Sequence, residues 1–82
     1  MVHQKHTRDL QVTEQNIQQA RDYINYEKAT IQNLRESGRD SQTAEALLHA
    51  LELAVSVLEQ HRKLIREELA LDRMVSRREI RH

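Results

Sequence analysis

The sequence of 82 residues contains no proline and a single glycine, Gly38. Both residue types interrupt helices, and folds built from strands and turns need several of them. A chain with only one such position is expected to form long, uninterrupted helices. In the segment 37–41, Gly38 can adopt the left-handed conformation that ends a helix, and Asp40 or Ser41 can cap the amides of the next one.

Gly38 divides the chain into two helical segments. We predict one all-α domain over residues 1–82, with a helix over about 8–37, a turn at 38–40, a second helix over about 41–75 and a frayed basic tail over 76–82. A turn of about 3–5 residues leaves the second helix no route except back along the first. The predicted fold is therefore an antiparallel two-helix hairpin.

The first segment carries one apolar stripe of the coiled-coil type. Leu10, Ile17, Ile24 and Ile31 recur at seven-residue intervals, as in a heptad seam. The intervening seam positions hold Thr13, Ala20, Glu27 and Leu34. In the predicted pairing, Leu34 lies at the level of Ala44, Ile31 faces Leu47, Ile24 faces Ala54, Ile17 lies at the level of His61, and Leu10 lies near Leu69.

The second segment is apolar around much of its circumference. Eleven of the fifteen residues from 44 to 58 are Ala, Leu or Val. At about 100° per residue the apolar positions form two neighbouring stripes. The first holds Ala44, Leu47, Leu48, Leu51, Ala54, Val55, Leu58, Ile65 and Leu69, and the second holds Ala46, Ala50, Leu53, Val57, Leu64, Leu71 and Val75. Together they span about 220°, about twice what a helix buries against one neighbour.

One companion helix cannot cover both stripes, and monomers rarely expose contiguous apolar patches of more than a few hundred Å². We therefore predict a homodimer in which two hairpins form a four-helix bundle. A larger or heteromeric assembly is the alternative, and the pairing direction of the second helices stays open. The predicted interface consists of Ala46, Ala50, Leu53, Val57, Leu64 and Leu71.

Catalytic and metal-binding patterns are weak in this sequence, and we expect no enzyme activity, no cofactor and no metal. His3 and His6 have a spacing that could place two imidazoles on one helix face for zinc, but no further ligands follow in register. His61 interrupts the apolar arc and is expected to be half-buried and hydrogen-bonded at the seam. Glu27 occupies a seam position from which its carboxylate can extend to water.

The charges of the chain balance, with 13 Lys and Arg against 13 Asp and Glu. The hairpin nevertheless gathers basic residues at its open end, where they could meet phosphates. Acidic residues lie in the same region and would repel phosphates. Nucleic-acid binding is therefore the alternative function, and protein–protein interaction is the preferred one. The basic residues are Lys5, Arg8, Arg62, Lys63, Arg66, Arg73, Arg77, Arg78 and Arg81.

No apolar run approaches the ~18 residues that span a bilayer, and the first six residues are too polar for the apolar core of a signal peptide. Cysteine is absent, so disulfides cannot supply stability. The expected location is the cytoplasm.

Over roughly residues 14–69, the chain resembles a group of small bacterial proteins of unknown function. The resemblance rests on the helix end 24–34, the turn 37–41, the run 44–48 that reads Ala-Glu-Ala-Leu-Leu, and Leu58 with His61-Arg62. It implies the two-helix fold. The chain is also similar, more distantly, to the two-helix phosphatases of phosphorylated response regulators, which carry a Ser-x-x-x-Asp signature; here Ser41 and Glu45 occupy those positions, with glutamate in place of aspartate.

Overall fold

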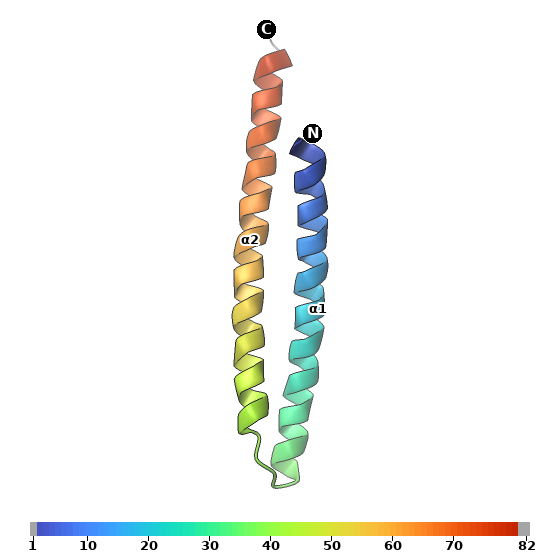
Figure 1. Ribbon diagram of the computed structural model, residues 1–82, viewed down its shortest axis with the longest axis vertical. Coiled ribbons are helices and arrows are strands. Elements are labelled where there is room, and N and C mark those ends of the chain that lie inside the picture. The colour runs from blue at the N-terminus through green and yellow to red at the C-terminus, as the bar shows by residue number, and fades with distance from the viewer. Residues whose placement is uncertain (1, 81–82) are drawn as a thin grey trace.

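The computed structural model describes residues 2–80, and the side chains of residues 5–75. Two helices make up this part of the chain, α1 (Val2–Glu36) and α2 (Gln42–Ile80). They run antiparallel along a rod of 70 × 14 × 14 Å and are joined by one short turn (Figure 1). The prediction of an all-helical hairpin is confirmed.

Both helices are longer than predicted. α1 begins at Val2 and not near residue 8, and α2 ends at Ile80 and not near residue 75. α2 continues past the start of α1 (Figure 1), so the first turns of α1 have a helix beside them. No Gly or Pro interrupts the chain beyond Gly38, which explains why most of the expected tail is helical. Residues 81 and 82 of that tail lie outside the described residues.

The turn has the hydrogen bonds of a glycine-terminated helix. Gly38 has a φ of 69°, the amide of Arg39 donates to the Leu34 carbonyl at 2.8 Å, and the amide of Gly38 donates to the Arg35 carbonyl at 3.1 Å. These two bonds satisfy carbonyls at the end of α1. The Asp40 carboxylate accepts a 2.9 Å hydrogen bond from the Gln42 amide and so caps α2. The predicted position and chemistry of the turn are confirmed.

The core is a single seam between the two helices. Ile17 is the most deeply buried side chain, with 1% of its surface exposed. The α1 seam follows the predicted heptad positions, because Leu10, Ala20, Ile24, Glu27 and Leu34 are half-buried along the same line. The buried residues are Thr13, Ile17 and Ile31 on α1 and Val55, Ile65 and Leu69 on α2.

On α2 the seam follows the first predicted stripe, with Ala44 and Leu69 at their predicted levels, but the other three predicted pairings are off by one residue. Leu48, Val55 and Arg62 occupy the positions expected for Leu47, Ala54 and His61, and those three predicted seam residues are exposed. Each residue turns a helix by about 100°, so this shift buries the larger Val55 in place of alanine. The hypothesis that His61 is half-buried at the seam is therefore wrong.

Candidate functional site

The most distinctive surface of the molecule is the side of α2 that α1 leaves uncovered. Ala46, Ala50, Leu53, Val57, Leu64 and Leu71 are all exposed in the single chain, and we call these six residues the outer face of α2. The exposed fractions of its four larger side chains run from 56% for Leu53 and Leu64 to 68% for Val57. At about 100° per residue, this face is centred roughly 130° around α2 from the seam.

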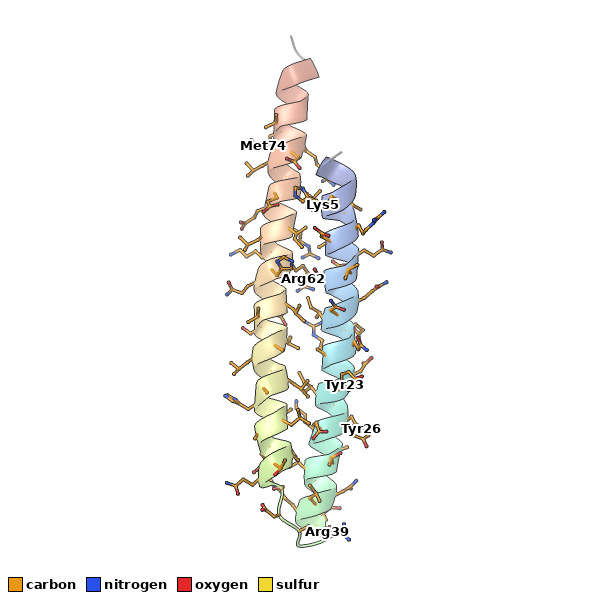
Figure 2. All side chains as sticks on the ribbon, viewed as in Figure 1. Lys5, Tyr23, Tyr26, Arg39, Arg62 and Met74 are labelled. Carbon is orange, nitrogen blue, oxygen red and sulfur yellow. The ribbon has the colours of Figure 1, made fainter. Side chains whose placement is uncertain are left out.

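Further apolar side chains extend this face toward both ends of α2. Leu47 borders its beginning, and Met74 and Val75, each 54% exposed, continue it beyond Leu71. Figure 2 shows Met74 on the side of α2 away from α1. Among residues 5–75, the large apolar side chains that are exposed outnumber the apolar ones that are buried by ten to five, and seven of the ten are on α2. The exposed apolar side chains of the hairpin are therefore concentrated on α2.

Ion pairs across the seam fix the register of the two helices. Arg21 Nη2 lies 3.2 Å from Glu59 Oε1, and Arg66 Nη2 lies 2.9 Å from Glu14 Oε1. A third pair joins Arg35 to Glu45 beside the turn. In each of the three pairs the two residue numbers add up to 80. The helices are therefore antiparallel and keep the same register along the whole seam.

His6 lies between the helices at the open end of the hairpin. Its Nε2 is 2.9 Å from Glu68 Oε2, its Nδ1 is 3.1 Å from Asp72 Oδ2, and 17% of its side chain is exposed. Because the sequence predicts a first helix that begins near residue 8, His6 lies in a part of α1 that was not predicted. Glu68 and Asp72 stand four residues apart on one face of α2, and that spacing opposite a seam histidine is the sequence signal that could have predicted the cluster.

No match was found among protein-family models, curated proteins or solved structures. What the molecule can do must therefore be inferred from its own side chains.

The start of α2 carries Ser41 and Glu45, the two positions that the phosphatase signature would occupy. Ser41 is half-buried, and the Glu45 carboxylate is engaged by the guanidinium of Arg35.

Among the side chains that the structure describes, no group of three or more His, Cys, Asp or Glu is arranged to hold a metal ion. The side chain of His3 lies outside that part.

The predicted basic cluster at the open end is interspersed with acidic side chains. Arg66 pairs with Glu14, Arg62 is half-buried at the seam, and Lys5, Arg8, Lys63 and Arg73 are exposed. The side chains of Arg77 and Arg78, and all of Arg81, lie outside the described part.

Across residues 2–80, no helical stretch combines the length and hydropathy that a membrane crossing requires.

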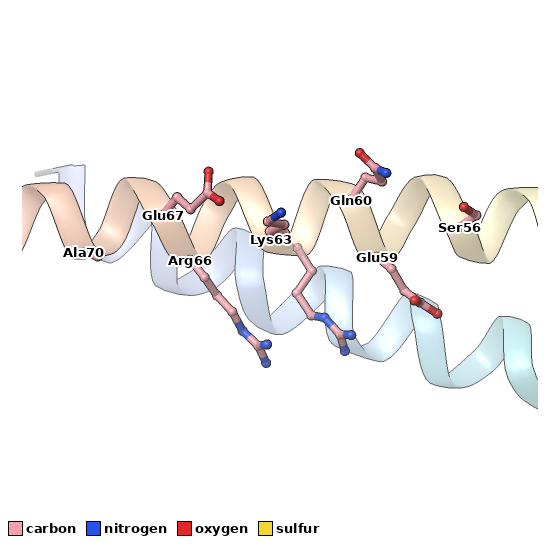
Figure 3. A pocket seen from close by; sticks show the side chains of 8 residues that line it. Ser56, Glu59, Gln60, Lys63, Arg66, Glu67 and Ala70 are labelled. Atoms are coloured by element: carbon pink, nitrogen blue, oxygen red, sulfur yellow. The ribbon is translucent and has the colours of Figure 1, made fainter.

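An open depression of about 520 Å³ lies along α2 between the seam and the outer face, which its lining residues Gln60 and Glu67 border. Figure 3 shows Glu59 and Arg66 directed toward α1 across it, while Gln60 and Glu67 point away. Its lining comes from α2 alone, and five of the eight residues carry a charge: the lining residues are Ser56, Glu59, Gln60, Arg62, Lys63, Arg66, Glu67 and Ala70. A second depression of about 460 Å³ near the turn is also lined mainly by polar side chains, including the Arg35–Glu45 pair. Neither depression offers the apolar, enclosed surroundings typical of small-molecule sites.

Proposed function

We propose that this chain is a non-enzymatic protein–protein interaction module that acts as a homodimer, with the outer face of α2 as its contact surface. The observation that carries the proposal is the exposure of Leu53, Val57, Leu64 and Leu71, each more than half exposed along one side of a helix. Exposed apolar side chains that gather on one side of a helix typically mark an interface. Covering it would give α2 two packed sides, as in a four-helix bundle.

Two properties of the face favour a second copy of the chain as the occupant. Ala46 and Ala50 are small enough to let another helix approach closely. The charges of α2 are also divided along its length: three acidic and no basic residues lie from 42 to 60, whereas six basic and four acidic residues lie from 61 to 80. A surface that carries both signs can complement itself across a two-fold axis.

The test introduces two carboxylates into the face with Leu53→Glu/Val57→Glu. Because ionised carboxylates are costly to bury without partners, the proposal predicts that light scattering finds a dimer for the wild type and a monomer, or an unfolded chain, for this variant.

The matched control is Gln11→Glu/Gln15→Glu, which adds two carboxylates with the same spacing on α1. Both glutamines are exposed and lie opposite the seam. The control is expected to remain a folded dimer. Equal masses for the wild type and the Leu53→Glu/Val57→Glu variant, with helicity intact, would overturn the proposal.

A further inference from the structure

The outer face of α2 changes in side-chain size along its length. It begins with two alanines, Ala46 and Ala50, and ends with two leucines, Leu64 and Leu71, all of them exposed. Interfaces between helices pack best when small side chains on one helix meet large ones on the other, because two small ones leave a void and two large ones force the helices apart. The packing between two copies of α2 therefore depends on whether they run parallel or antiparallel.

We propose that two copies pair α2 against α2 in opposite directions, about a two-fold axis near residues 58 and 59. This inference rests on the proposed function and specifies the geometry of that interface. In this arrangement, Ala46 of one copy meets Leu71 of the other, and Leu53 meets Leu64. A parallel pair in register would instead place Ala46 and Ala50 on their own counterparts, whereas the antiparallel pair sets Ala46 on Leu71 and Ala50 on Glu67.

The charge distribution of α2 favours the same direction. A parallel pair aligns the acidic half of α2 with its own counterpart, whereas an antiparallel pair sets it beside the basic half of the other copy. Glu45 and Glu59 already pair with Arg35 and Arg21 of their own α1, which leaves Glu52 as the acidic residue of this half with no partner on α1 among the described ion pairs. Glu52 and Lys63 are both exposed and lie on the same side of α2, about 100–120° around the helix from the centre of the outer face. In the antiparallel arrangement, Glu52 of one copy comes within about one helical turn of Lys63 of the other. Such rim charges contribute little energy, but they discriminate between directions.

The antiparallel arrangement determines the form of the assembly. The two turns that contain Gly38 point to opposite ends, so each end carries the turn of one copy beside the open end of the other. The dimer is then a rod with two identical ends, suited to joining two like partners. A parallel dimer would have one end with both turns and another with both open ends.

A distance measurement between the two turns tests the direction without altering the interface. The chain has no cysteine, and Arg39 is exposed in the turn, so Arg39→Cys accepts a single spin label. At 1.5 Å per residue, the antiparallel dimer predicts about 60 Å between the two labels in double electron–electron resonance. A parallel dimer predicts roughly 30 Å or less, since packed helices lie 8–10 Å apart.

The outcomes separate the two proposals. A dimeric labelled chain with the long distance supports antiparallel pairing. A dimeric chain with the short distance overturns the antiparallel arrangement and leaves self-association standing. A labelled chain that scatters light as a monomer and shows no intermolecular distance overturns self-association, and the pairing direction with it. Adding Leu53→Glu/Val57→Glu to the labelled chain is expected to abolish the long distance while the helical signal of any folded fraction persists.

Discussion

The Nδ1 of His6 lies 3.1 Å from the Oδ2 of Asp72, although 66 positions separate the two residues in the sequence. This contact ties the first turns of α1 to the far part of α2, at the end opposite the turn. With Glu68 on the other ring nitrogen, both nitrogens of the imidazole have a carboxylate partner. The open end of the hairpin is therefore held by side chains and not only by helix propensity.

Replacing His6 by alanine is expected to loosen the start of α1. Glu68 is 57% exposed and its pair with His6 is screened by solvent, so most of the effect comes from Asp72, which is 30% exposed. We expect a loss on the order of 1 kcal/mol, concentrated locally. Amide hydrogen exchange should show faster exchange over residues 7–13 and little change near the turn. His49→Ala, at an exposed position, is the control, and identical exchange in the two variants would contradict the role of His6.

Ile17→Ala tests the seam at its most buried position. Truncating a buried isoleucine typically costs about 2–5 kcal/mol, because apolar contacts are lost and a cavity remains. Val12 is 48% exposed on the same helix, so Val12→Ala is expected to change the free energy of unfolding by about 0.5 kcal/mol or less. Urea unfolding of both variants at one protein concentration measures the difference. Similar midpoints for the two variants would show that the seam is not the core of the hairpin.

Gly38→Ala tests the backbone of the turn. A Cβ at this position would meet nothing within 4 Å, so the expected cost arises from the φ of 69° alone. We expect about 1–2 kcal/mol for alanine and less for Gly38→Asn, since asparagine tolerates the left-handed region better. Thermal unfolding of the two variants beside the wild type provides the comparison. An alanine variant as stable as the wild type would mean that the turn relaxes out of this conformation.

Exchanging the sizes of two residues on the outer face tests the proposed antiparallel dimer. Ala46→Leu alone should crowd the interface, and Leu71→Ala alone should leave a cavity, so each is expected to weaken the dimer by about 1–3 kcal/mol. The double variant Ala46→Leu/Leu71→Ala restores one small and one large side chain at each contact. Its dimer dissociation constant, measured by sedimentation, should return most of the way toward the wild-type value. Additive losses would indicate that these two positions do not meet.

Much of the fold could be predicted because the sequence patterns are local. The seven-residue spacing from Leu10 to Ile31 identifies the seam of α1, and Gly38 with Asp40 identifies the turn through the backbone groups that they satisfy. Three predicted pairings on α2 were off by one residue, because Leu47 and Leu48, or Ala54 and Val55, are both apolar and periodicity alone does not decide between them. Packing decides, since it buries the larger Val55 and brings Glu59 and Arg66 within reach of α1.

The His6 contacts could not be inferred in the same way. They depend on α1 beginning before residue 8 and lying beside α2 there, and the apolar seam pattern of α1, which starts at Leu10, does not extend to His6. The outer face of α2 was predictable from composition, because the apolar arc is wider than one neighbour can cover. Its occupant stays a proposal.

Sedimentation equilibrium of the wild-type chain over a range of concentrations tests self-association most directly. One chain has a mass of 9.7 kDa. We expect the weight-average mass to approach twice this value at micromolar concentrations and to fall toward it on dilution, since the same apolar face is present on every copy. A mass that stays at 9.7 kDa at every concentration, from a chain that remains helical, would contradict the proposal.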